Sequence, residues 1–94
     1  MKNYIAEFLG TYILCLTMLL INKYYHTPLS MQVGIVFATM FTLAVFNKND
    51  ADFNPAITFM YYLDSKRSII DLISFTLSQI SAAALAFLTI RLIF

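Results

Sequence analysis

Few residues in this sequence could carry chemistry, and they are not grouped as catalysis requires. The carboxylates Glu7, Asp50 and Asp52, the single Cys15 and the single His26 form no nucleophile–base pair and no ligand set. Nucleophilic catalysis needs a base beside the nucleophile, and a metal site needs several His, Cys or carboxylate ligands at short spacings. The sequence therefore predicts no enzyme activity, no metal site and no cofactor.

The segment Asn54-Pro55-Ala56 offers a different kind of chemistry, the start of a helix. Asn is favoured just before a helix, and Pro suits the first helical position. A helix is therefore expected from Pro55 to Leu63. Its first turn would present unpaired backbone N–H groups and the positive end of the helix dipole, which orient water and repel cations.

Composition indicates that these residues belong to a membrane protein. Of the 94 residues, 61% are hydrophobic and 12% are charged, and the mean hydropathy is +0.78. Ordinary soluble domains carry about twice this share of charged residues. A net charge of +1 does not indicate binding to nucleic acid. A single cysteine cannot form a disulfide within one chain.

Charged residues are grouped into islands that divide the sequence into apolar runs. The islands are Lys23, residues 48–52 and residues 64–67. A helix needs about 20 apolar residues to cross a membrane. We expect three spanning helices, at about 4–22, 30–46 and 68–94. The first is interpreted as a retained helix, because no small-residue cleavage site of a secretory signal follows it.

Small residues recur every four positions in the third run, where they line one face of the helix. They are Ser74, Ser78, Ala82 and Ala86. Such a stripe allows helix backbones to approach closely within a membrane. An ordinary Ala- and Ser-rich helix has the same pattern, so the stripe predicts packing only.

The segment between the second and third runs, at about 47–63, is too short to span. A helix of about nine residues is about 13 Å long, less than half of the ~30 Å hydrocarbon core. It can lie flat on the membrane or dip inward as a re-entrant segment. Apolar residues cover most of its circumference, which favours the re-entrant form; they are Ile57, Phe59, Met60, Tyr61 and Leu63. The expected fold class is an all-α membrane protein with three transmembrane helices and one re-entrant half-helix.

Four segments, in order along the chain, resemble the aquaporin and glycerol-facilitator family. Asp52-Phe53-Asn54-Pro55-Ala56-Ile57-Thr58 resembles its first-repeat signature, which is usually His-Phe/Leu-Asn-Pro-Ala-Val-Thr. Ala6-Glu7-Phe8-Leu9-Gly10-Thr11 resembles the opening of the family's first helix. Gly34-Ile35-Val36-Phe37-Ala38 resembles its second helix, and Ser78-Gln79 resembles its third. Asn-Pro-Ala alone would be weak evidence, but the four segments together cover essentially the whole chain.

The resemblance implies roles for individual residues. Asn54, Pro55 and Ala56 would lie at the pore. Glu7 would be a buried carboxylate that holds the loop backbone in place, with Gln79 as a comparable polar support. The alternative for Glu7 is a solvated side chain near the membrane surface, since a carboxylate within a span is otherwise costly.

Two further pore positions depend on how the connector before Asp52 aligns with the family. If the connector is shorter, Phe37 corresponds to the aromatic residue of the narrow selectivity filter; without a gap, that position falls on Gly34. Asp52 itself stands where the family usually has His. With Asp50 it could attract cations at a pore mouth, be neutralised by Lys48, or form a solvated acidic loop.

Family members are inverted repeats of two three-helix halves, and the resemblance covers the first half only. It therefore implies a half-channel for passive transport of water or small neutral solutes. The second half would be an identical chain in the opposite orientation, giving an inverted homodimer, or a complementary second-half channel protein. Alternatives are a non-conducting truncated or interaction subunit of a membrane channel, and a small cation pore.

Membrane lipid is the expected surrounding, and the plasma (inner) membrane the expected location. Basic residues favour a cytoplasmic N-terminus by four to two. Lys2, Lys48, Lys66 and Arg67 would be inside, and Lys23 and Arg91 outside. This weak bias leaves insertion in both orientations open.

Overall fold

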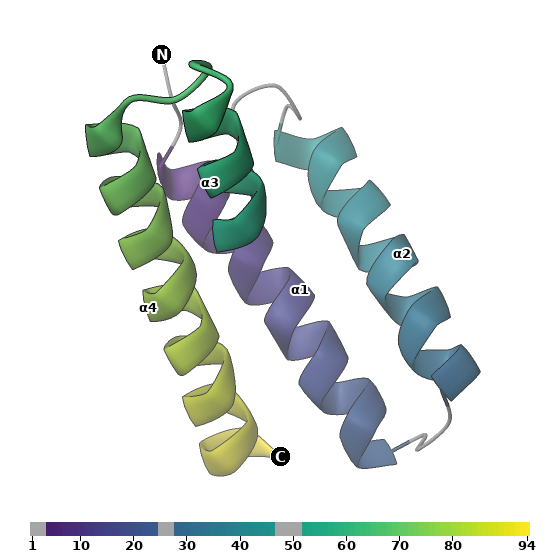
Figure 1. Cartoon of the computed structure of the whole chain (residues 1–94). Coiled ribbons are helices and arrows are strands. Elements are labelled where there is room, and N and C mark those ends of the chain that lie inside the picture. The colour runs from purple at the N-terminus through teal and green to yellow at the C-terminus, as the bar shows by residue number, and fades with distance from the viewer. Residues whose placement is uncertain (1–3, 25–27, 47–51) are drawn as a thin grey trace.

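The computed structural model describes the backbone of residues 4–24, 28–46 and 52–94, and their side chains except at 30, 31 and 41–46. This part of the chain forms four helices and no strand (Figure 1). They are α1 (Tyr4–Tyr24), α2 (Pro28–Phe46), α3 (Pro55–Leu63) and α4 (Ile69–Ile93). Each helix begins and ends within two residues of the bounds expected from the sequence.

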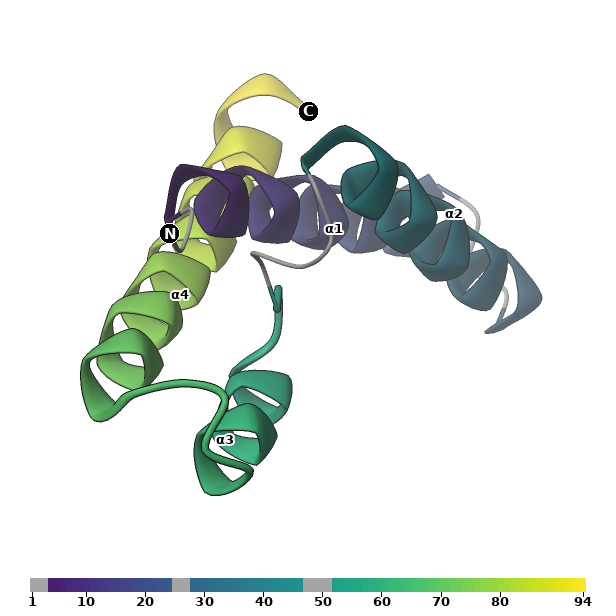
Figure 2. The ribbon, with the colours of Figure 1, turned by 90° about the horizontal axis from the view of Figure 1, so that it is seen from above.

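The three long helices lie side by side, with α1 between α2 and α4 (Figure 1). The short helix α3 packs against α4 and lies on one side of the layer that the long helices form (Figure 2). It extends from the end where α4 begins to about the middle of α4 (Figure 1). The start of α3 therefore lies partway along the long helices, and its end lies near one end of them.

Helix lengths separate α3 from the others. The helices α1 and α4, of 21 and 25 residues, are long and apolar enough to cross a membrane, at about 32 and 37 Å. The helix α2 has 19 residues and contains no Asp, Glu, Lys or Arg. Large apolar side chains face outward, with Ile5 73% and Leu92 82% exposed. Such a surface suits lipid better than water.

Small residues fill the contacts between the long helices, as the stripe on the third run predicts in part. Ala82 and Ala86 are fully buried on α4, whereas Ser74 and Ser78 are half-buried. Phe75 and Gln79 are the buried residues in that half of α4. The packed face is rotated because the Phe75 ring meets Tyr4 edge-on, with 5.3 Å between ring centroids.

A tight turn joins α3 to α4. The N–H of Ser65 donates to the carbonyl of Tyr62 at 3.1 Å, and the N–H of Lys66 donates to the carbonyl of Tyr61 at 2.8 Å. These two bonds form a Schellman motif, in which the residue after the C-cap takes the left-handed conformation usual for Gly. Here that residue is Ser65, with φ 60°. Ser68 then caps α4.

The substitution Ser65→Gly is expected to stabilise the protein by about 0.5–1 kcal/mol. It relieves a left-handed conformation that costs a residue with a Cβ about 1–2 kcal/mol, and the larger unfolded-state entropy of Gly cancels only part of this gain. The measurement is the free energy of unfolding in detergent micelles. Ser68→Ala is the control of opposite sign, because it removes the cap of α4 at a cost of about 1 kcal/mol. A loss of stability in Ser65→Gly would contradict this account of the turn.

Candidate functional site

The start of α3 is built by Asn54, and the helix expected there is confirmed. Asn54 has an extended backbone, and its Oδ1 accepts a hydrogen bond from the N–H of Ala56 at 2.8 Å. Pro55 is the first helical residue, and the side chains of all three residues are exposed. Because Oδ1 is turned toward the helix, the Nδ2 amide of Asn54 is turned away from it. The helix start is therefore open on one side and carries amide donors.

Glu7 on α1 holds the backbone that leads into α3. Its Oε2 accepts the N–H of Asp52 at 2.6 Å, and its Oε1 accepts the N–H of Phe53 at 2.5 Å. The Glu7 side chain is fully buried, so the alternative of a solvated Glu7 is wrong. The carboxylate satisfies two consecutive N–H groups that no helix or strand would pair.

Phe53 packs against one face of α1. Phe53 is 7% exposed and has a positive φ of 65°. Its carbonyl accepts a 3.5 Å hydrogen bond from Thr11 Oγ1. Its ring lies over Gly10, where an added Cβ would come within 2.0 Å of a ring carbon. Glu7, Gly10 and Thr11 share one helix face, since they are three and four positions apart.

Gln79 on α4 joins Glu7 to α3. Its Nε2 donates to Glu7 Oε1 at 2.5 Å and to Thr58 Oγ1 at 3.1 Å. Thr58 in turn donates from both its N–H and its Oγ1 to the carbonyl of Asn54, at 3.0 and 3.2 Å. Gln79 is 2% exposed and Thr58 is fully buried. A continuous polar network thus runs from α4 through α1 to the start of α3.

One atom of this network is left over. Within the described residues, the buried Oε1 of Gln79 has no hydrogen-bond partner. The opposite orientation of the amide would place Oε1 against the Glu7 carboxylate, where two acceptors would repel. Donation to Glu7 therefore fixes the direction of the Gln79 amide, and Glu7 receives three donors in total.

Asp52 is not a free acidic group at a surface, which corrects one expectation from the sequence. Its side chain is 1% exposed and forms a bidentate ion pair with Arg67, with Oδ1 2.7 Å from Nη2 and Oδ2 3.1 Å from Nε. Burial alone would lower the pKa of Arg67, but Asp52, aided by Asp71, raises it above its usual value. Asp50 and Lys48, the other members of the expected acidic loop, lie outside the described residues.

The structure also separates the two candidates for the filter aromatic. Gly34 faces α1, because a Cβ added there would meet the end of the Ile21 side chain at 1.8 Å. Phe37, one turn away on α2, is 72% exposed. The role of Phe37 in a selectivity filter therefore stays a prediction, carried by an exposed side chain on α2.

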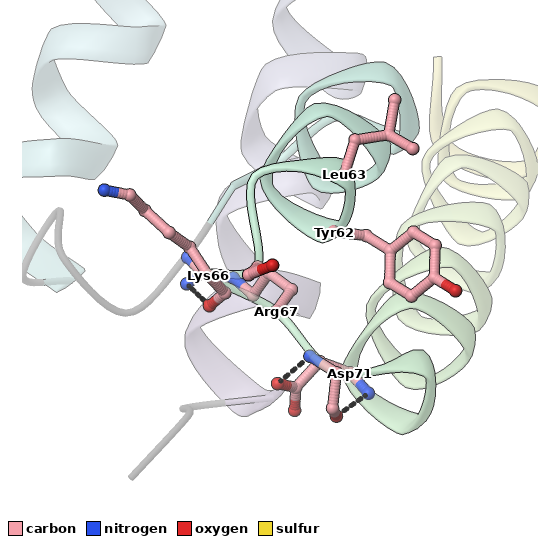
Figure 3. A pocket seen from close by; sticks show the side chains of 7 residues that line it. Tyr62, Leu63, Lys66, Arg67 and Asp71 are labelled. Carbon is pink, nitrogen blue, oxygen red and sulfur yellow. Dashed lines mark hydrogen bonds between the residues drawn. The ribbon is translucent and has the colours of Figure 1, made fainter.

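An open depression of about 700 Å³ lies at the turn between α3 and α4 (Figure 3). It is lined by Tyr62, Leu63, Ser65, Lys66, Arg67, Ser68 and Asp71. None of these is a predicted site residue, and the polar groups of Ser68 and Asp71 bond to each other in the cap of α4. Among the side chains that the structure describes, no three His, Cys, Asp or Glu gather as they would around a metal ion.

The family of the chain follows from a comparison with models of known protein families. The model of the major intrinsic protein family matches residues 1–94. The chain is a major intrinsic protein. Members of this family are integral membrane channels for water or small solutes, so the chain is an integral membrane protein of a transport family. Neither the curated proteins nor the solved structures yield a match.

Three residues of this major intrinsic protein's site were missed by sequence reasoning. Arg67 forms the ion pair with Asp52, and Thr58 accepts the hydrogen bond from Gln79. The ring of Phe53 lies over Gly10. Thr58 and Phe53 lie within the segment that resembles the family signature, and their polar or aromatic character was a usable signal. Arg67 gave none, because only the folded turn brings it to Asp52, 15 positions earlier.

The substitution Gly10→Ala is expected to destabilise this protein by about 1–3 kcal/mol, the usual cost of overpacking. The new methyl would overlap the Phe53 ring, whose backbone is fixed by hydrogen bonds at its N–H and its carbonyl. Gly34→Ala is the matched control, because its closest contact is the end of the flexible Ile21 side chain rather than a ring. Unfolding in detergent micelles measures both; equal effects would contradict the fit of Phe53 on α1.

The substitution Glu7→Gln is expected to cost about 1–3 kcal/mol. One carboxylate oxygen becomes an NH₂ group that faces a backbone N–H, which leaves a buried donor unpaired. Asp64→Asn, on an exposed carboxylate, is the control and should change the unfolding free energy by less than about 0.5 kcal/mol. A neutral result for Glu7→Gln would show that the loop N–H groups have other partners.

Proposed function

We propose that this chain forms half of a pore for water or small neutral solutes. In this proposal α1, α2 and α4 cross the membrane, and residues 52–63 form a re-entrant segment that ends in the half-helix α3. The observation that carries the proposal is the polar network beneath α3: Glu7 and Gln79 satisfy the irregular backbone and Thr58. Irregular backbone is tolerated at membrane depth only where protein or water satisfies it.

The same network argues against α3 lying flat on the membrane surface. A surface helix would turn its polar residues to water. Thr58 instead is fully buried against Gln79 of α4, while Phe59 and Met60 on the same helix are about half exposed. The polar face of α3 therefore points into the protein, as a re-entrant helix requires.

The open start of α3 gives the pore its chemistry. The first N–H groups of the helix and the Nδ2 amide of Asn54 present donors at one point. The positive end of the helix dipole adds to them. A water molecule at this point would turn its oxygen toward Asn54, and a cation would be repelled. No reaction and no cofactor are part of this function.

One half-helix closes no pore, so a second half is required. We propose an inverted second copy or a complementary second-half protein, packed on the open side of α3. Two copies in opposite orientations reproduce the symmetry of an inverted repeat. A cytoplasmic N-terminus in the plasma (inner) membrane remains the favoured orientation.

A small cation pore is the weaker proposal. It requires free carboxylates at a mouth, and Asp52 is buried and paired with Arg67. A non-conducting interaction subunit is also a weaker proposal, because it assigns no ligand to the exposed amide donors at Asn54.

The test is osmotic water flux into proteoliposomes that carry the assembled protein. Asn54→Asp is expected to lower this flux about tenfold or more, equivalent to a change of about 1.4 kcal/mol at the narrowest point. Asp caps a helix as well as Asn, so α3 stays folded while the amide donors are replaced by a carboxylate.

Asn22→Asp, an exposed position near the end of α1, makes the same chemical change away from the pore and should leave the flux unchanged. Circular dichroism of both variants checks the fold. Absence of water flux from pure, assembled wild-type protein would overturn the proposal, as would an undiminished flux in Asn54→Asp.

A further inference from the structure

The ion pair between Asp52 and Arg67 joins the two ends of the half-helix unit. Asp52 lies two residues before the cap of α3, and Arg67 lies in the turn after it. Both oxygens of Asp52 are bonded to the guanidinium, with side chains 1% and 10% exposed. Paired fork geometry of this kind fixes direction as well as distance. The segment entering α3 is thus fixed to the segment leaving it.

Arg67 is itself held on three sides, so it is a rigid anchor. Its guanidinium lies over the rings of Tyr61 and Phe75, at 5.1 and 5.5 Å from their centroids. Its Nη1 donates to the carbonyl of Lys66 at 3.1 Å. Arg67 therefore contacts α3, α4 and the turn between them. Movement of the Arg67 side chain would break contacts with all three.

The charge of Arg67 has a second consequence. Asp52 is next to Glu7, since its own N–H donates to the Glu7 carboxylate at 2.6 Å. Two carboxylates therefore stand beside the segment that leads to Asn54, and the guanidinium of Arg67 is bonded to one of them, Asp52. Without that guanidinium, two buried negative charges would attract cations to this segment.

We propose that Arg67 is a positioning and specificity-determining residue of the half-pore. It fixes the segment before Asn54, and it cancels the charge of Asp52 so that a buried acid can stand there without attracting cations. This inference rests on the proposed pore. Arg67 and Asp52 act as a single unit, because each residue neutralises the buried charge of the other.

The test compares Arg67→Gln, Asp52→Asn, the double variant D52N/R67Q and Lys66→Gln. Lys66 is the matched control, because it neighbours Arg67 and its side chain forms an exposed pair with Asp64. Removing one partner of a buried pair leaves an uncompensated charge, whereas replacing both is far milder. The double variant therefore preserves the fold if a single variant does not.

The first readout is hydrogen exchange of the full chain in neutral phosphatidylcholine vesicles. We expect exchange at residues 52–58 to rise about 10- to 100-fold in Arg67→Gln, with little change in Lys66→Gln. The double variant should exchange more slowly than Arg67→Gln. Equal exchange in Arg67→Gln and Lys66→Gln would overturn the positioning role, whether or not the protein conducts.

The second readout is potassium leak from the same vesicles. Arg67→Gln should leak K⁺ at least about tenfold faster than wild type, and D52N/R67Q should lose that leak because the unpaired carboxylate is gone. A leak that persists in the double variant, or none in Arg67→Gln beside normal water flux, would overturn the specificity role. Absence of wild-type water flux would instead count against the pore itself, and hydrogen exchange would still decide the positioning role.

Discussion

An irregular backbone inside a membrane protein needs a partner for each N–H group, and here one carboxylate supplies two of them. Glu7 accepts the N–H groups of Asp52 and Phe53 in succession. Without it, both donors would be buried and unpaired, at a cost of about 1–3 kcal/mol each. The position of α3 depends on this contact, because the two residues it fixes stand directly before the cap of the helix.

The rest of the packing follows from bringing that segment close to α1. Gly10 has no side chain because the Phe53 ring occupies its place. Ala82 and Ala86 are small because α4 must approach α1 closely enough for Gln79 to reach Glu7. Among the described side chains, the buried ones are therefore small residues and two Phe rings around one polar network rather than a large apolar core. Apolar side chains, which would form the core of a soluble protein, face outward instead.

The sequence predicted much of this arrangement, for physical reasons that can be named. Asn54 and Pro55 are local signals that depend only on their neighbours in the chain, and they located the start of α3 correctly. Apolar runs between charged islands located the long helices. The resemblance to a family pointed to Glu7 and Gln79, whose shared network no local pattern would have shown.

What the sequence did not predict depends on contacts between distant segments. Asp52 was expected at a pore mouth, where it could attract cations, be neutralised by Lys48 or lie in a solvated acidic loop. It is instead buried and paired with Arg67, which the turn after α3 brings to it. Ser65 takes a left-handed conformation that its residue type does not announce. The face of α4 is rotated from the predicted stripe, because Phe75 and Gln79 bind partners on α1. Each difference arises from tertiary structure.

The bonds of Gln79 join a late part of the chain to an early one. Glu7 is synthesised early, and its partners arrive 45, 46 and 72 positions later. Gln79, which binds both Glu7 and Thr58, belongs to α4, the last of the described helices in the chain. The contacts that bury Thr58 against α4 can therefore form only after α4 has been synthesised. The helix made last determines when the one made before it is locked in place.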